Sequence, residues 1–193
     1  MNQYPGQPNY SLYRYPLREL RSQSGLLVYP TEAVWGLGCD PWDNLALARL
    51  LQLKNRPWHK GLIVVTGNAQ YFEPEISALP ADIAHELRFN WPFATSLLMP
   101  DPLNRFTQLV KGQHSKVVLR VCQHPFVQWY TQNVFPYLIS TSANRATKSP
   151  VKYVWQAHKR FSDHVSFIMP GRTLGKKTPS RILDPMTQQV IRS

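Results

Sequence analysis

The sequence predicts an α/β protein in which strands and helices alternate along one domain. Short apolar runs rich in β-branched residues, such as Gly61-Leu62-Ile63-Val64-Val65-Thr66, indicate buried strands. Segments with apolar residues at helical spacing, such as 43–54, lie between these strands. A chain of 193 residues can enclose a substantial core, and no internal repeat or long linker divides it. The interleaving predicts a mixed sheet flanked by helices.

The first part of the chain predicts an arm, a helix and a strand. Residues 1–10 are rich in Pro, Asn, Gln and Tyr and are expected to form a flexible N-terminal arm before a domain at 11–193. Leucines and arginines at helical spacing predict a short helix within 11–24, which Pro16 would start or interrupt. The apolar run at 26–29 then predicts a buried strand.

The stretch 29–41 predicts a turn that joins this strand to a helix. Gly36 and Gly38 allow positive φ or a close approach of the backbone to another group, which favours a Gly-rich turn. Asp43 is suited to cap the helix 43–54, and Pro57 ends that helix. The same patterns predict the remaining elements: helices over 79–89, 124–133 and 151–161, and strands over 94–99, 116–121, 137–140, 165–169, 180–183 and 188–191.

Charge and composition limit the possible functions. The chain has 22 Lys and Arg against 11 Asp and Glu, a formal net charge of +11. Such an excess attracts polyanions, including nucleotides and nucleic acids. No apolar run approaches the roughly 20 residues that span a bilayer. No secretory signal is recognisable at the start, so we expect a cytoplasmic protein without a membrane partner.

The two cysteines, Cys39 and Cys122, are too few for a disulfide scaffold and lack metal-ligand spacing. Cys39 lies within the stretch 29–41, which makes it a candidate catalytic thiol, but the favoured interpretation is a small buried residue.

Two polar clusters are candidates for a nucleotide site. Lys54, Arg56 and Lys60 follow one another at the end of the helix 43–54. Gripping a triphosphate needs several cations, and Arg can bind phosphate with two hydrogen bonds. The alternative is that these cations are solvated and favourably placed against the helix dipole. Ser140-Thr141-Ser142-Ala143-Asn144 follows a strand and predicts either a polar lip of a ligand site or a capped turn.

The segment 171–178 is similar to a phosphate-binding P-loop but does not match one. Its glycine spacing is one residue short, and Pro179 prevents a helix from following directly. A Walker A site is therefore not expected.

Several motifs resemble those of the YrdC/TsaC family of threonylcarbamoyl-AMP synthases. The stretch 29–38, Y-P-T-E-A-V-W-G-L-G, resembles the family signature Y-P-T-E-T-x-Y-G-L-G, with Ala33 and Trp35 as departures. The family's K-x-R and S-x-N pair is matched by Lys54/Arg56 and Ser142/Asn144. Further matches keep the family order: Trp91-Pro92, Val118-Leu119-Arg120 leading to His124-Pro125, the run 178–184, and Val190-Ile191-Arg192.

Two departures affect the expected pocket. Phe93 stands where the family's W-P-G-P-x-T motif has a flexible glycine, which leaves the pocket shape open. Ala146-Thr147 stands where Ser-Gly usually follows S-A-N, which leaves the loop on the nucleotide side open.

The resemblance implies a YrdC-like twisted mixed sheet with a basic concave site, in the short bacterial form. It also implies synthesis of threonylcarbamoyl-AMP and pyrophosphate from L-threonine, bicarbonate and ATP. The product would serve threonylcarbamoyladenosine modification of tRNA beside the anticodon, with tRNA and the tRNA threonylcarbamoyl transferase complex as partners. Mg²⁺ would arrive with ATP, since no cluster of protein metal ligands is visible.

The resemblance also assigns site residues. The catalytic set is Lys54, Arg56, Ser142 and Asn144. The ATP-binding set is Lys54, Arg56, Lys60, Ser142, Asn144, Ser149 and Arg192. The threonine-binding set is Thr31, Arg120, Ser140 and Ser180.

Arg120 is expected to bind the threonine carboxylate. It closes the run 116–120, so its side chain is predicted to emerge at a strand end, where Thr31 could add a hydroxyl. A guanidinium can take a carboxylate with two parallel hydrogen bonds. The alternative is an ion pair with an acidic neighbour.

A second function remains open: an RNA-binding paralogue of the same fold without synthase activity, favoured by the charge of +11. Pyrophosphate release from ATP that depends on both threonine and bicarbonate would discriminate the two.

Overall fold

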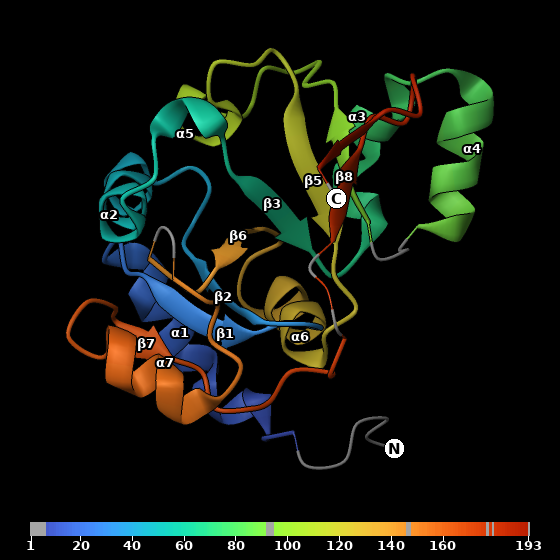
Figure 1. Ribbon diagram of the computed structural model, residues 1–193. Helices are drawn as coiled ribbons and strands as arrows, with labels where there is room; N and C mark the ends of the chain where they lie inside the picture. Colours follow the sequence, from blue (N-terminus) through green and yellow to red (C-terminus); the bar gives the residue numbers. More distant parts are fainter. Residues whose placement is uncertain (1–6, 92–94, 146–147, 177, 179, 193) are drawn as a thin grey trace.

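A nine-stranded mixed sheet organises the protein (Figure 1). The computed structural model describes residues 7–91, 95–145, 148–176, 178 and 180–192. The strands are β1 (Leu27–Pro30), β2 (Trp35–Gly38), β3 (Ile63–Thr66), β4 (Thr95–Met99), β5 (Val117–Val121), β6 (Leu138–Ser142), β7 (Phe167–Ile168), β8 (Arg181–Leu183) and β9 (Val190–Arg192). Their order is β7-β1-β2-β6-β3-β5-β4-β8-β9. The pairs β1/β7, β3/β5 and β4/β8 are parallel and the other neighbours are antiparallel, so the predicted mixed sheet is confirmed.

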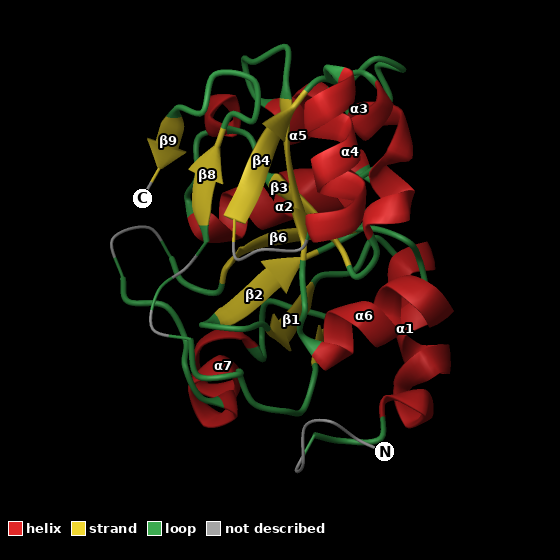
Figure 2. Ribbon diagram, turned by 90° about the vertical axis from the view of Figure 1, so that its right-hand side faces the viewer, coloured by secondary structure: helices red, strands yellow, loops and turns green. Residues whose placement is uncertain are grey.

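Helices surround this sheet (Figures 1 and 2). They are α1 (Arg14–Ser22), α2 (Asn44–Lys54), α3 (Glu73–Ser77), α4 (Ala81–Asn90), α5 (Gln108–Lys111), α6 (Pro125–Asn133) and α7 (Val154–Phe161). Short 3₁₀ turns lie at Tyr10–Tyr13, Trp58–Lys60 and Ala69–Phe72. Figure 2 shows α1 beside α6 and α3 beside α4.

The core is divided by the sheet because successive side chains of a strand point to opposite faces. Leu26 and Val28 join a cluster packed with α2, α4 and α7, whereas Leu27 and Tyr29 join one packed with α1 and α6. All four residues of β1 are buried, as the short apolar run predicts.

The N-terminal residues that the structure describes contact the body of the protein. Tyr10 is buried and packs edge-on against Phe126 of α6, with ring centroids 5.5 Å apart. Gln7 Nε2 donates a hydrogen bond to the carbonyl of Arg172 at 2.9 Å. Residues 1–6 of the expected arm lie outside the described residues, as do Phe93, Ala146, Thr147 and Pro179.

The predicted Gly-rich turn at 36–38 is wrong. Gly36 and Gly38 lie within β2, which pairs antiparallel with β1, and the turn is formed by residues 31–34. The glycines serve close approach instead of positive φ: a Cβ on Gly38 would lie 2.0 Å from the carbonyl oxygen of Ile139 in β6. β6 extends past the predicted 140 to Ser142, because Ser142 pairs with Gly36.

Several short elements were not predicted. The chain forms a 3₁₀ turn and α3 over 69–77 and the four-residue α5 at 108–111. Segments this short contain too few turns for a helical period to be visible. After the 171–178 segment the next regular element is β8, so no helix follows it as a P-loop would require.

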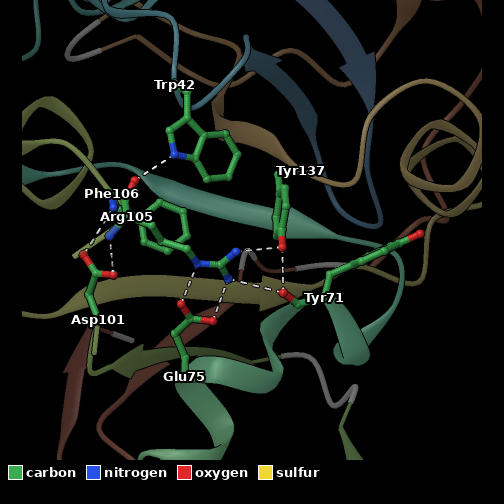
Figure 3. Close-up of polar contacts among 7 residues, drawn as sticks. All are labelled: Trp42, Tyr71, Glu75, Asp101, Arg105, Phe106 and Tyr137. Carbon is green, nitrogen blue, oxygen red and sulfur yellow. Dashed lines mark hydrogen bonds and ion pairs between the residues drawn. The ribbon is translucent and has the colours of Figure 1, made fainter. Parts of the chain in front are cut away.

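A buried polar cluster around Arg105 joins loops near α3 (Figure 3). Arg105 Nε and Nη2 donate to the two carboxylate oxygens of Glu75, both at 2.7 Å. Arg105 Nη1 donates to the Tyr137 hydroxyl at 2.8 Å, and the Trp42 indole donates to the Arg105 carbonyl at 2.7 Å. The Glu75 side chain has no exposed surface, so this ion pair with two hydrogen bonds anchors the loop that carries Arg105 to α3 in the protein interior.

Candidate functional site

A cavity of about 480 Å³ gathers ten of the eleven residues predicted for the site. These are Thr31, Lys54, Arg56, Lys60, Arg120, Ser140, Ser142, Asn144, Ser180 and Arg192. Ser149 is the exception, since it lines a separate cavity with Arg145, Lys148 and Arg160. Four of them lie in strands β5, β6 and β9, and the others lie at the end of α2, in the 3₁₀ turn after it or in loops between the elements.

The end of α2 aims two cations into this cavity. Asn55 caps the helix in the left-handed conformation, with φ of 50° and ψ of 47°. Asn tolerates this conformation better than most residues. The chain therefore reverses between Lys54 and Arg56, and both line the cavity.

Lys54 holds the loop that follows β6. Its ammonium donates to the carbonyl oxygens of Ser142 at 2.5 Å and Asn144 at 2.7 Å, and to Asn144 Oδ1 at 3.3 Å. The Ser142 hydroxyl donates to the same Asn144 oxygen at 2.6 Å. Burial, and after it the charge of Arg56, lowers the pKa of Lys54 to about 8. Lys54 of the K-x-R motif and the two residues of the S-x-N motif thus form one hydrogen-bonded unit.

Arg56 and Arg192 are oriented by backbone carbonyls. Arg56 Nη2 donates to the Gly61 carbonyl at 2.8 Å and Arg192 Nη2 to the Ser180 carbonyl at 3.1 Å. Burial lowers the pKa of both guanidinium groups. The charge of Arg192 lowers the pKa of Arg56 further, and the charge of Arg120 lowers the pKa of Arg192 further. Arg192, predicted for the nucleotide side, therefore contacts Ser180 of the predicted threonine side.

Arg120 does not emerge at a strand end as predicted. It lies within β5 opposite Val65 of β3, and its side chain is only 15% exposed. Its Nη2 forms an ion pair with Glu32 Oε2 at 2.8 Å, so the alternative prediction of an ion pair with an acidic neighbour is confirmed. Its Nη1 donates to Ser180 Oγ at 3.0 Å. Arg120 Nε is buried without a hydrogen-bond partner in the described part of the chain.

Glu32 is a site residue that the sequence reading missed. The residue is only 2% exposed. Its carboxylate accepts hydrogen bonds from Arg120, from the Cys122 thiol at 3.1 Å and from the Gln123 backbone N–H at 3.1 Å. Burial opposes its ionisation, but Arg120 and these donors hold the pKa of Glu32 below its usual value. The sequence feature that could have identified Glu32 is its position, since it is an acidic residue within the motif 29–38 and directly follows Thr31.

The hydroxyls of the cavity are mostly engaged in local bonds. Thr31 Oγ1 donates to the Val34 carbonyl at 2.6 Å, which closes the turn after β1. Ser180 Oγ lies 2.9 Å from Ser96 Oγ and also accepts from Arg120. Thr31 and Ser180 keep lone pairs that can accept a hydrogen bond from a ligand.

The charge of the cavity suits an anionic ligand. Five cations line it: Lys54, Arg56, Lys60, Arg120 and Arg192. The described lining residues include no Asp or Glu. Nowhere in the described residues do three or more His, Cys, Asp or Glu side chains cluster as they would around a metal ion. The cavity therefore offers phosphates several cations but gives a metal no carboxylate ligand.

The cysteines are not reactive groups of this site. Cys39 and Cys122 are free and buried, and burial raises the pKa of both thiols.

The fold and the cavity together define a class: a single-domain α/β protein whose mixed sheet carries a cation-lined concave site. A family model for the Sua5/YciO/YrdC domain, described as telomere recombination, matches residues 19–193. The chain therefore belongs to the Sua5/YciO/YrdC family.

Curated relatives and solved structures agree with this membership. The chain is 39% identical over 168 residues to the threonylcarbamoyl-AMP synthase of Marinobacter nauticus, covering 87% of this chain and 88% of that one. It is 42% identical over 170 residues to the Pseudomonas aeruginosa PAO1 protein of the same name, covering 88% and 91%.

Among solved structures, a P. abyssi Sua5 variant superposes with a TM-score of 0.84 at 20% identity. It covers 94% of this chain and 55% of that longer one. E. coli YciO superposes with a TM-score of 0.77 at 17% identity, covering 98% and 94%. These likenesses show the fold.

Within the described residues, no helix has both the length and the apolar character needed to cross a bilayer.

Proposed function

We propose that this chain is a threonylcarbamoyl-AMP synthase that converts L-threonine, bicarbonate and ATP to threonylcarbamoyl-AMP and pyrophosphate. The observation that carries the proposal is the cavity, in which five cations and the K-x-R and S-x-N residues converge. Relatives that carry this name match most of the chain. We assign the catalytic unit to residues 11–193; of the residues before it, Gln7 and Tyr10 contact its body.

The reaction needs cations more than it needs a covalent nucleophile. The threonine amine and bicarbonate form a carbamate with loss of water. A carbamate oxygen then attacks the α-phosphorus of ATP, and the bond to pyrophosphate breaks. Both partners are anions, so fixed positive charge and positioning lower the barrier.

On the nucleotide side, Arg56, Lys60 and Arg192 face the phosphates. Lys54 acts with Ser142 and Asn144, since its three donors already point to that loop. Ser149 lines a separate cavity and not the substrate cavity, so we assign it an indirect role, in which it supports the loop after Asn144. Because the described lining residues lack carboxylates, the protein does not fit a resident Mg²⁺, and the metal enters on the phosphates of ATP.

On the threonine side, Arg120 provides the anchor. Its Nε is buried and without a partner in the described structure, which is costly unless a ligand accepts from it. Thr31, Ser140 and Ser180 surround it with hydroxyls. The Glu32 ion pair fixes the plane of the guanidinium toward the cavity.

The product passes to a tRNA threonylcarbamoyl transferase complex for modification of tRNA beside the anticodon, and we place the reaction in the cytoplasm. The test is pyrophosphate release by the purified chain with ATP, in the presence and absence of threonine and bicarbonate. Release that requires both co-substrates supports the synthase. Release that ignores either one, or none at all alongside RNA binding, would favour the RNA-binding paralogue.

A further inference from the structure

Two adjoining cavities outside the substrate cavity form a basic groove between α2, the loop after Asn144 and α7. They have volumes of about 780 and 580 Å³ and share Arg145, Lys148 and His164. We define the basic groove by six side chains: the cations Arg49, Arg145, Lys148, Lys159 and Arg160, together with His164, whose Nε2 lies 3.0 Å from Arg145 Nη2. In Figure 1, α2 and α7 lie on the same side of the molecule, above and below β1 and β2.

The basic groove is positively charged without compensation from its walls. The residues described as lining the two cavities include no Asp or Glu. None of the six groove side chains takes part in the ion pairs found among the described residues. Lys148 and Lys159 are exposed, and their ammonium groups make no hydrogen bond within the described part of the chain. Lys148 and Lys159 thus keep their ammonium groups available to an anion, whereas Arg49, Arg145 and Arg160 each make a hydrogen bond within the groove or its border.

Exposed aromatic side chains lie on α7, the helix that carries Lys159 and Arg160 of the groove. On α7, Trp155 is 61% exposed, and Tyr153 at the start of the helix is 60% exposed. Trp155 precedes Lys159 by four residues, so both lie on one face of the helix. Large aromatic side chains without a packing partner beside free cations are typical of surfaces that bind unpaired bases and their phosphates.

We propose that the basic groove binds a single-stranded segment of RNA. Its phosphates lie along Arg145, Lys148 and Lys159, and an unpaired base stacks on Trp155. The cavities also present Gln52, Asn55 and Ser166, whose amides and hydroxyl can bond the ribose 2′-OH that distinguishes RNA from DNA. A lone phosphate ion would need neither the second cavity nor the aromatic face.

The groove adjoins the substrate cavity. Asn55 lines both, and Asn144 Nδ2 donates to the carbonyls of Arg145 and Lys148 at 3.1 and 2.7 Å. The proposed function implies that the protein works with RNA, and this inference names the surface that binds it. To that extent the inference rests on the proposed function. Its test needs no turnover, so the two can fail separately.

The test is fluorescence anisotropy with a labelled single-stranded RNA and the full chain, at several salt concentrations. We expect Lys148→Ala with Lys159→Ala to weaken binding and to reduce the slope of log Kd against log salt by about 1.4, or about 0.7 for each lost phosphate contact. Trp155→Ala should weaken binding about fivefold or more without changing that slope. These three side chains are exposed, so the variants should fold normally.

The matched control removes the same charge from α1, which Figure 2 shows away from α7. Arg14→Ala with Arg18→Ala should leave the salt slope unchanged. An equal loss in this control would reduce the proposal to net charge and overturn it. Equal binding of single-stranded DNA of the same sequence would also overturn the proposal. The same holds if pyrophosphate competes fully with the RNA and Trp155→Ala has no effect on binding. Threonine-dependent pyrophosphate release should stay at the wild-type level in the groove variants, whatever the outcome for RNA.

Discussion

The ammonium of Lys54 donates to the carbonyl oxygen of Ser142 at 2.5 Å, across 88 residues of sequence. It also donates to the carbonyl and side-chain oxygens of Asn144. An ammonium has three N–H donors, so this lysine directs all of them at the loop after β6. Lys54 therefore positions the loop, whereas Arg56 donates from Nε and Nη2 to the carbonyls of Gly61 and Lys60 and keeps Nη1 for a ligand.

The first prediction separates these two cations. Arg56→Ala should weaken ATP binding by roughly 1.5–3 kcal/mol, the worth of a charged hydrogen bond, with little change in the melting temperature. Lys54→Ala should weaken ATP binding and also lower the melting temperature, because the Ser142 carbonyl, the Asn144 carbonyl and Asn144 Oδ1 each lose a charged donor at a part-buried position. Isothermal titration calorimetry and thermal unfolding measure the two effects. Unchanged nucleotide affinity and turnover in both variants would remove these residues from the site.

The second prediction concerns pH. The pKa of Lys54 is about 8 in the folded protein against 10.5 as its ordinary value. Between these values the unfolded chain binds more protons, so raising the pH through this window makes the Lys54 contribution to stability more favourable. An anionic ligand favours the charged ammonium, so ATP binding near pH 8 should take up protons and weaken as the pH rises further.

Calorimetry in buffers of different ionisation enthalpy measures this proton uptake. Lys54→Arg is the control, because a guanidinium stays charged throughout and should abolish the Lys54 share of the uptake. Equal uptake in the variant and the wild type would assign the titration to another group.

The third prediction tests Arg120 as the threonine anchor. Arg120→Lys can keep one charged contact to Glu32 but loses the donors at Ser180 and at the unpartnered Nε. We expect the threonine KM to rise roughly tenfold to a hundredfold, with ATP affinity within about twofold of the wild type. Arg181→Lys, an exposed neighbour outside the cavity lining, is the matched control. Equal losses of ATP and threonine binding would show that Arg120 acts on the nucleotide or only on the structure.

The fourth prediction concerns the cluster in Figure 3. Glu75→Gln leaves the Arg105 guanidinium largely buried without its counter-charge and should lower the free energy of unfolding by about 3 kcal/mol. Urea unfolding measures this, and ATP affinity should not change because neither residue lines the substrate cavity. Glu73→Gln breaks the exposed pair with Arg88 and should hardly move the midpoint. A similar shift in both variants would mean that burial does not govern the Arg105 pair.

The sequence by itself determined the α/β class and most of the regular elements. Burial repeats every second residue in a strand and about every 3.6 residues in a helix, so a single stretch such as 27–30 or 44–54 contains its own signal. The sequence also placed Lys54 and Arg56 at the end of a helix, but the left-handed conformation of Asn55 between them is a finding of the structure. The family motifs supplied the other members of the cavity.

Only the tertiary structure decided which side chains meet. Glu32 and Arg120 are 88 residues apart, and nothing local to either one names the other. The same holds for Gly38, whose missing Cβ is required by the carbonyl of Ile139 on the neighbouring strand. Strand periodicity fixes the face on which a side chain lies, but the order and register of the strands fix its partner, and these depend on the packing of the whole sheet.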